Sequence, residues 1–287
     1  MTMVISEQPI RIWNLSPTFS LKIDRSGILV ADYLKMLDVS WVFGENPDAD
    51  CALYKEDVGH LTASRVWMEV KRRFLKPVPF ISLIGEPREL APAAYLLAQN
   101  HNTLAVAPGK GLPRLYFASE WLDPMLEDWH KRADCVCWIA RPLPERVLLA
   151  RQLIDGGIPV HIYSRERWPL PVWQGFAKDE VNVARRYRYR IVMENSCANG
   201  YHSEKMFNSI RCGCITFYQG DPSLNLSHAA GTFLPLDLQT IQRRGDIASE
   251  VLKEMERFMF SNAWEIYSFK AFYDRIIGLA KVIASKQ

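Results

Sequence analysis

One stretch of the chain, residues 187–220, contains the polar and charged side chains best suited to bind a phosphorylated ligand. Within it, Ser203 is a typical helix N-cap, and Lys205 follows in the first helical turn. Backbone N–H groups and the helix dipole favour an anion at such a helix N-terminus, and Lys205 adds a full positive charge. The pattern therefore predicts a phosphate site where a loop meets the helix.

Two predicted strands flank this helix. Residues 187–193 are rich in β-branched and aromatic side chains, Gly213 ends the helix, and a second strand begins at residue 215. This strand–helix–strand unit brings the loop after the first strand to the helix N-terminus. The polar residues of that loop and of the first helical turn are the candidate ligand-binding residues: Glu194, Asn195, Ser196, Tyr201, Ser203 and Glu204.

The order of residues over 187–220 resembles the donor-binding signature of the α-1,3/1,4-fucosyltransferases, glycosyltransferase family 10, in their soluble bacterial form. The matching residues are Tyr187, Arg188, Tyr189, Glu194, Asn195, Ser196, Gly200, Tyr201, Ser203, Glu204, Lys205, Gly213 and Gly220. Met193 stands for the usual phenylalanine, Ser203 for a threonine and Thr216 for a proline. Serine caps a helix about as well as threonine, so the departure at Ser203 keeps the predicted phosphate site.

Two upstream segments resemble further parts of the same family. Residues 142–164 match a segment in which an arginine precedes an amphipathic helix and a strand, and Arg146 takes the place of that arginine. Residues 78–87 match a strand that ends in a glutamate on the acceptor side of the active site, and Glu86 takes the place of that glutamate.

The resemblance implies a GT-B glycosyltransferase fold, an α/β architecture of two facing Rossmann-like domains. Residues 1–133 would form the acceptor-side domain, and residues 134–287 the nucleotide-sugar donor domain with a C-terminal helical segment. The residues themselves favour a parallel sheet, because strand and helix patterns alternate from residue 135 to about residue 236. Residues 245–285 have a helical period almost throughout.

The resemblance also implies a reaction. A fucosyltransferase of this kind inverts the sugar carbon as it transfers L-fucose from GDP-fucose to a hydroxyl of a glycan, here expected to be a surface polysaccharide or lipopolysaccharide. It needs no cofactor and no essential metal. The residues alone indicate only a nucleotide-diphosphate sugar, so two alternatives stay open. One is a sister transferase that uses another activated sugar, and the other is an inactive relative that binds nucleotide or glycan.

Such a transfer makes specific chemical demands. Breakage of the C1–O bond leaves extra negative charge on the pyrophosphate, which fixed cations must stabilise, and Lys205 and Arg146 are the candidate cations. The acceptor hydroxyl must lose its proton to a carboxylate on the opposite side of C1. Glu86 is the candidate base, and Glu89 and Glu120 are the nearby rivals.

The remaining polar residues of the signature are expected to hold the donor. Glu194, Asn195 and Glu204 would hydrogen-bond ribose or sugar hydroxyls, and Tyr201 would close over the donor. His202 beside Glu204 is interpreted as a loop histidine near the substrate, with a metal pair as the alternative.

Composition is consistent with a soluble enzyme with a sizeable core. The chain has 287 residues, of which 48% are hydrophobic, and its net charge of +3 is too small to indicate nucleic acid. No apolar run is long enough to span a membrane, and the N-terminus lacks a signal-peptide pattern. Together with these absences, the resemblance to the soluble bacterial form implies a cytoplasmic protein, peripheral at the inner membrane face.

Several patterns have competing interpretations. Asp48 and Asp50 form a D-x-D triplet, which we interpret as a polar loop rather than a metal site. Residues 184–190 alternate arginine and tyrosine, which is typical of a half-exposed strand face as well as of a nucleic-acid patch. Reduced core thiols are expected at the six cysteines, with a metal site or disulfide as the alternative. The tryptophans and tyrosines are expected mostly in the core, with Trp121, Trp168 and Trp173 as candidate sugar-stacking faces.

Further elements are predicted from periodicity and propensity. The predicted strands cover residues 11–13, 39–43, 51–54, 80–84, 104–106, 115–117, 135–139 and 159–163, and the predicted helices cover residues 63–74 and 124–132.

Overall fold

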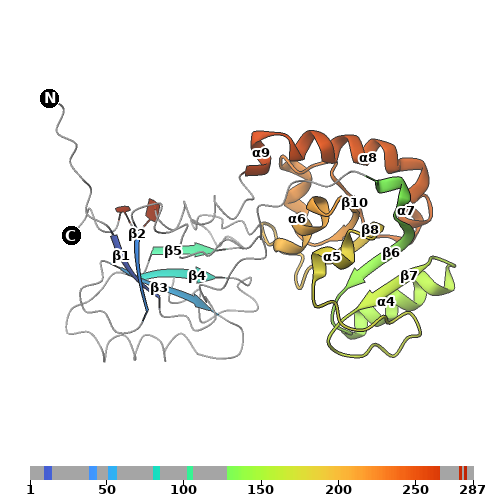
Figure 1. The fold of residues 1–287 in the computed structure, drawn as a ribbon, viewed down its shortest axis with the longest axis horizontal. Helices are drawn as coiled ribbons and strands as arrows, with labels where there is room; N and C mark the ends of the chain where they lie inside the picture. The colour runs from blue at the N-terminus through green and yellow to red at the C-terminus, as the bar shows by residue number, and fades with distance from the viewer. Residues whose placement is uncertain are drawn as a thin grey trace. The chain divides into compact units, whose positions relative to one another are not determined.

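The computed structural model describes residues 128–265 continuously. Outside that range it describes the strands 10–14, 39–43, 51–56, 80–84 and 102–105 and the helical residues 278, 279, 281 and 282. The chain separates into two compact units, the first formed by residues 1–121 and 268–287 and the second by residues 122–267 (Figure 1). The predicted domain boundary after residue 133 stays a prediction.

The first unit contains a parallel sheet with the order β2-β1-β3-β4-β5. Its strands are β1 (Ile10–Asn14), β2 (Val39–Phe43), β3 (Cys51–Glu56), β4 (Phe80–Ile84) and β5 (Asn102–Ala105). All five were predicted, β2 and β4 with the observed bounds. The predicted helix 63–74 and strand 115–117 lie outside the described residues, as do Asp48 and Asp50.

The second unit contains a parallel sheet with the order β10-β9-β8-β6-β7. Its strands are β6 (Ala133–Ile139), β7 (Val160–Tyr163), β8 (Tyr187–Met193), β9 (Ile215–Gln219) and β10 (Phe233–Pro235). Counted along the chain, this is the doubly wound order 2-1-3-4-5, in which the winding reverses between the first and third strands. That switch point lies between β6 and β8, and ligands of such folds bind outside the carboxyl ends of the strands there.

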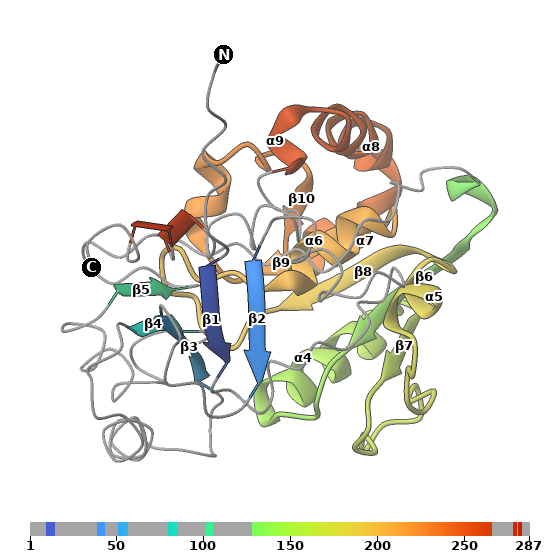
Figure 2. The same ribbon diagram turned by 60° about the vertical axis from the view of Figure 1, so that its left-hand side comes forward.

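Helices pack on the second sheet: α6 on β8 and β9, α4 on β7, α5 on β8 and α8 on β9. Figures 1 and 2 show α7 leading into α8 in the upper part of this unit and α4 in its lower part, and Arg244 at the start of α8 pairs with Asp134 of β6. The bounds are α4 (Pro144–Asp155), α5 (Glu180–Ala184), α6 (Glu204–Arg211), α7 (Leu238–Gln242), α8 (Arg244–Met259) and α9 (Asn262–Glu265), with 3₁₀ turns at η1 (Trp129–Lys131) and η2 (Pro222–Leu226). Among the described helices, none is long and apolar enough to cross a membrane.

The strand β8 corrects one prediction. A half-exposed arginine face was expected over residues 184–190, but Arg190 is only 1% exposed and pairs with Glu180. Arg188 is partly buried against the Trp129 ring and donates to the His130 carbonyl. The prediction is wrong at Arg190 because β8 lies between β6 and β9 and is covered by α5 and α6, whereas Arg186, just before the strand, is exposed.

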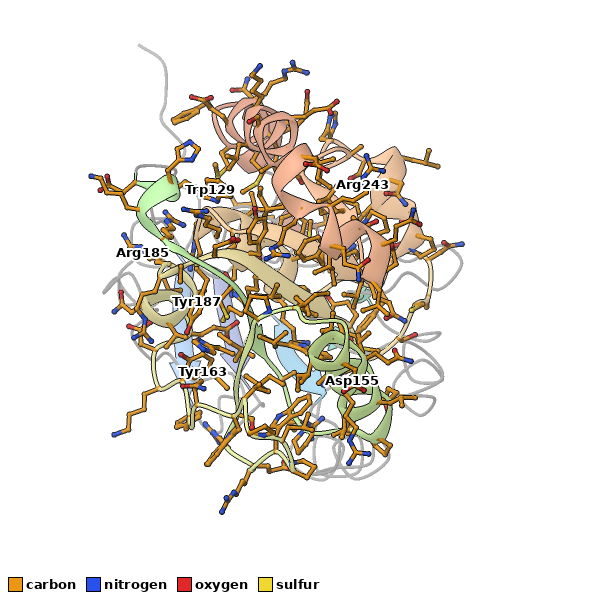
Figure 3. The ribbon with its side chains drawn as sticks, turned by 90° about the vertical axis from the view of Figure 1, so that its right-hand side faces the viewer. Trp129, Asp155, Tyr163, Arg185, Tyr187 and Arg243 are labelled. Carbon is orange, nitrogen blue, oxygen red and sulfur yellow. The ribbon has the colours of Figure 1, made fainter. Side chains whose placement is uncertain are left out.

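The core of the second unit is aromatic and contains its own polar contacts. Trp168 is 1% exposed, donates from Nε1 to the Ala140 carbonyl at 2.9 Å, and packs against Trp138. It therefore has no free face for a sugar, and that prediction is wrong. The buried Tyr163 and Tyr187 lie with their hydroxyl oxygens 2.6 Å apart (Figure 3).

Four cysteines are buried in this unit with free thiols: Cys135, Cys137, Cys212 and Cys214. Burial raises the pKa of Cys135 to about 11 and that of Cys137 to about 12, so both thiols stay protonated at neutral pH. The fifth described cysteine, Cys197, is also free and is exposed.

Candidate functional site

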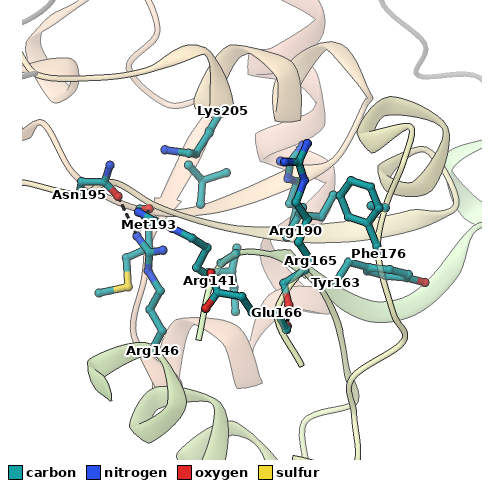
Figure 4. A pocket seen from close by; sticks show the side chains of 16 residues that line it. Arg141, Arg146, Tyr163, Arg165, Glu166, Phe176, Arg190, Met193, Asn195 and Lys205 are labelled. Atoms are coloured by element: carbon teal, nitrogen blue, oxygen red, sulfur yellow. Dashed lines mark hydrogen bonds between the residues drawn. The ribbon is translucent and has the colours of Figure 1, made fainter. Parts of the chain in front are cut away.

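A cavity of about 320 Å³ opens at the carboxyl ends of β6, β7 and β8 (Figure 4). The lining residues come from three places: the end of β6 and the start of α4, the end of β7 and the loop after it, and the end of β8 with the first turn of α6. This is the topological switch point of the sheet, where doubly wound proteins bind ligands. Arginine and lysine side chains dominate its charged lining.

Lys205 reaches the cavity from the first turn of α6. Ser203 is the N-cap residue of this helix, as predicted, and its Oγ accepts from the Lys205 N–H at 3.4 Å. The Nζ atom of Lys205 lies 3.4 Å from Oε2 of Glu194, and the lysine side chain remains 31% exposed. The ammonium group is therefore anchored on one side and open to a ligand on the other.

Glu194, the residue after β8, has a fully buried side chain. Its Oε1 accepts the Ser203 N–H at 2.8 Å, and its Oε2 accepts the Ser203 hydroxyl at 2.7 Å. The carboxylate thus organises the start of α6 and holds Lys205. Both carboxylate oxygens accept hydrogen bonds from within the protein, and the predicted contact of Glu194 with donor hydroxyls stays a prediction.

Gly220 permits this close packing. A Cβ added to Gly220 would lie 2.5 Å from Cγ of Glu194 and would also clash with the Tyr218 hydroxyl. The glycine, which belongs to the predicted signature, is therefore required so that the strand end after β9 can approach the buried carboxylate.

Arg146 reaches the same cavity from the first turn of α4. It is 4% exposed, and its Nη2 donates to Oδ1 of Asn195 at 3.2 Å and to the Met193 carbonyl at 3.3 Å (Figure 4). Its buried Nε has no hydrogen-bond partner among the described residues. Burial lowers the pKa of Arg146, Glu145 raises it, and the neighbouring Arg141 lowers it. A ligand with negative charge would relieve both the desolvation and the repulsion.

A second network fixes the loop between β8 and α6. The buried Asp221 accepts from the Gly200 N–H at 2.7 Å, from Nδ1 of His202 at 2.8 Å and from the Ser223 hydroxyl at 2.6 Å. Burial alone would raise the pKa of Asp221, but these hydrogen bonds lower it to about 2. His202, interpreted as a histidine near the substrate, thus anchors the loop from within the core.

The structure brings together three of the predicted site residues as cavity-lining groups, Arg146, Asn195 and Lys205. Ser203 precedes Lys205 by two residues and donates its hydroxyl hydrogen bond to Glu194. Ser196 accepts from the Ala198 N–H within the loop. Tyr201 is 2% exposed and does not line the cavity, so its closing over the donor stays a prediction. Glu86 and the side chain of Glu204 lie outside what the structure describes.

The sequence analysis missed four charged lining residues: Arg141, Arg165, Glu166 and Arg190. Arg141, Arg165 and Glu166 follow the ends of β6 and β7 within three residues. Carboxyl ends of parallel strands share one edge of a sheet, so polar residues directly after predicted strands were the available signal. Within residues 128–265, no group of three or more His, Cys, Asp or Glu side chains is arranged to hold a metal ion.

The two parallel sheets, with the helices on the second, give an α/β fold similar to that of solved fucosyltransferase structures. A crystal structure of α1,3-fucosyltransferase aligns with a TM-score of 0.62 at 14% identity, over 99% of this chain and 92% of that one. Structures of α1,3-fucosyltransferase with GDP and with GDP-fucose align at TM-scores of 0.60 and 0.52, at 13% and 14% identity. Both alignments cover 99% of this chain, together with 92% of the GDP-bound structure and 93% of the GDP-fucose-bound structure.

At these identities the likeness is one of fold. Comparison with models of protein families and with curated protein sequences gives no match.

Proposed function

We propose that the protein is an inverting glycosyltransferase of the GT-B type that transfers L-fucose from GDP-fucose to a hydroxyl of a glycan acceptor. The observation that carries the proposal is the convergence of Lys205, Arg146 and the N-terminus of α6 on one cavity at the switch point of the sheet. A diphosphate is the ligand that two fixed cations and a helix N-terminus suit best. The fucosyltransferase-like fold supports GDP-fucose as its carrier.

In the proposed reaction the acceptor oxygen forms a bond to C1 of the sugar as the bond between C1 and the β-phosphate oxygen breaks. The electron pair of that bond leaves with GDP, and the acceptor proton passes to a carboxylate, for which Glu86 is the candidate. In this proposal Lys205 and Arg146, which line the cavity, stabilise the charge that develops on the leaving group. Glu194 positions Lys205, and Asn195 orients the guanidinium of Arg146.

The wider setting is part of the same proposal. Residues 1–133 would bind the acceptor and residues 134–287 the donor. The acceptor would be a surface polysaccharide or lipopolysaccharide made at the inner face of a membrane, so the enzyme would act in the cytoplasm. The transfer would need neither a cofactor nor a metal.

A donor screen tests the proposal directly. GDP should raise the thermal unfolding midpoint, since ligand at a hundredfold over its Kd adds about 2.7 kcal/mol of stability, and EDTA should not abolish the shift. GDP-fucose should then be consumed with a glycan acceptor. The matched control is the exposed Lys178→Ala, which should leave both readouts unchanged.

The outcomes separate the alternatives. Transfer with another nucleotide sugar but not with GDP-fucose would indicate a sister transferase, and GDP binding without transfer to any acceptor would indicate an inactive relative. Absence of any GDP-induced shift, or a strict need for a divalent metal, would contradict the site assignment itself.

A further inference from the structure

The cavity has two chemically different ends. Arg141, Arg146 and Lys205 line one end, near the starts of α4 and α6 (Figure 4). The other end lies beyond β7, and Figure 4 shows Tyr163, Arg165 and Phe176 there. The cationic end matches a diphosphate, and it leaves the aromatic end without an assigned role.

The segment after β7 is built to place an aromatic ring at this end. Residues 172–175 run parallel to β7 as an extra edge, with the Ile162 N–H donating to the Val172 carbonyl at 3.0 Å and the Ser164 N–H to the Gly175 carbonyl at 2.9 Å. Gly175 has a φ of 100°, which lets the chain turn sharply there. The next residue, Phe176, is thereby delivered to the carboxyl end of β7, where it lines the cavity.

Phe176 is unusual because a large apolar side chain remains 49% exposed beside a cavity. The guanidinium carbon of Arg165 lies 5.1 Å from the centre of its ring. The ring is therefore already used as a stacking surface by one planar, delocalised group. A nucleobase is another planar group that stacks on such a ring.

Glu166 is the acidic group at this end. Its backbone is held because the Ser164 hydroxyl donates to the Glu166 carbonyl. Its carboxylate takes part in none of the hydrogen bonds or ion pairs described within residues 128–265, although Arg141 and Arg165 line the same cavity. In the dinucleotide-binding form of the doubly wound fold, a carboxylate about 20 residues after the first strand–helix turn accepts a hydrogen bond from a ribose hydroxyl of the bound nucleotide. Here β7 is the second strand, and Glu166 follows its last residue, Tyr163, by three positions.

We propose that this end of the cavity binds the nucleoside of the donor. The Glu166 carboxylate accepts from the ribose hydroxyls, and the base stacks on Phe176 in the manner of the Arg165 guanidinium. The inference deepens the proposed function, because it takes the cationic end to hold the diphosphate. It assigns recognition of ribose and base to residues outside the signature at 187–220.

The test compares GDP with 2′-deoxy-GDP by calorimetric titration. Loss of a hydrogen bond to a charged group should weaken wild-type binding of the deoxy ligand by roughly 10-fold or more. Glu166→Gln should bind GDP more weakly by a similar factor. The difference in affinity between GDP and 2′-deoxy-GDP should then shrink, because the variant and the deoxy ligand each remove the same hydrogen bond. The exposed Glu250→Gln on α8 is the matched control and should behave as the wild type.

A second pair of variants tests the stacking surface. Phe176→Ala should lower the affinity for GDP by roughly 5- to 100-fold, as at other sites where an aromatic side chain stacks on a base. It should leave the weak binding of free pyrophosphate unchanged. Leu148→Ala, at another exposed apolar residue of this unit, should change neither. Both test positions are exposed, so circular dichroism should show intact folding.

The failures can be told apart. If the wild type binds GDP but Glu166→Gln keeps the full discrimination against 2′-deoxy-GDP, or Phe176→Ala keeps full affinity, the nucleoside assignment is overturned and the proposed function stands. If the wild type binds neither GDP nor pyrophosphate, the proposed function fails together with this inference.

Discussion

At the scale of single residues, Lys205 carries the clearest prediction. Lys205→Ala removes a charge that acts most strongly when the leaving group forms, so kcat should fall on the order of 10²–10³-fold. Lys205→Arg should restore only part of the rate, because a planar fork does not reproduce a point charge held by Glu194. Steady-state transfer assays measure both, with Lys178→Ala as control. Turnover near the wild-type value in Lys205→Ala would exclude the proposed role.

Arg141 gives a smaller and salt-dependent prediction. It is exposed, and its charge acts on the neighbouring Arg146, so it is expected to meet the diphosphate as an additional cation. Arg141→Ala should lower kcat/KM by roughly fivefold at low ionic strength, and the loss should shrink at high salt because exposed charges are screened. The exposed Arg151→Ala on α4 is the control. An unchanged kcat/KM at low salt would remove Arg141 from the site.

The residue scale also shows what the sequence could predict. Asn195 and Lys205 were predicted from the ordered signature and a helix N-cap, and Arg146 from the resemblance of residues 142–164. All three line the cavity. Arg141 and Glu166 carry no such mark. Their place becomes evident only when β6, β7 and β8 are known to be neighbours, which no local pattern encodes.

At the scale of elements, the approach of β9 to β8 depends on Gly220. Gly220→Ala would force Glu194 or Tyr218 to move, and overpacking of this kind costs about 1–3 kcal/mol. The unfolding free energy from urea titration should fall accordingly, and GDP should bind more weakly as Lys205 loses its partner. Gly245→Ala in α8 is the matched control, since nothing lies within 4 Å of an added Cβ there, and it should be neutral or stabilising. Equal stability of the two variants would show that the Glu194 packing is not needed.

The loop before α6 should lose stability in acid. The hydrogen bonds to Asp221 lower its pKa in the folded protein to about 2, below the ordinary value of 3.8. A group with a lowered folded pKa stabilises the fold above its unfolded pKa, and that contribution is lost as the pH falls through the folded value. The unfolding free energy should therefore drop between about pH 4 and pH 2.

The variant Asp221→Asn isolates this contribution. It should be less stable than the wild type at neutral pH and should show a shallower pH dependence of the unfolding free energy below pH 4. An exposed carboxylate, Asp155→Asn at the end of α4, is the comparison. Parallel pH profiles for the wild type and Asp221→Asn would contradict the assigned role of the carboxylate.

Strand positions were predictable from the sequence, and their burial was less so. The bounds of β2 and β4 match the prediction because short β-branched and aromatic runs mark strands in any sheet. The alternation in β8 indicated one exposed face, yet Arg190 is buried beside Glu180. A strand that has neighbours on both sides and is covered by helices is buried on both faces. A buried arginine that pairs with a carboxylate cannot be told from a surface arginine in the sequence.

At the scale of the whole molecule, both sheets have the same strand order, in which the first strand pairs with the second and the third. The alternation of strands and helices predicted parallel sheets, but it did not predict this order. The order matters because it sets where the winding reverses and so where a ligand binds. In the second unit that position coincides with the cavity of Arg146 and Lys205.

The last prediction requires both units and concerns Glu86. In the sequence Glu86 stands two residues after the end of β4, and in open parallel sheets ligands bind beyond the carboxyl ends of the strands. If Glu86 is the base, it acts on the acceptor, whereas the cavity of the second unit is proposed to bind the donor. Glu86→Gln should therefore keep the fold and the affinity for GDP, while transfer falls by roughly 10²–10⁴-fold. Glu89→Gln and Glu120→Gln are the controls and should transfer normally. Normal transfer by Glu86→Gln with a loss in Glu89→Gln would move the role to Glu89. Normal transfer by all three variants would mean that proton removal does not depend on a carboxylate in this region.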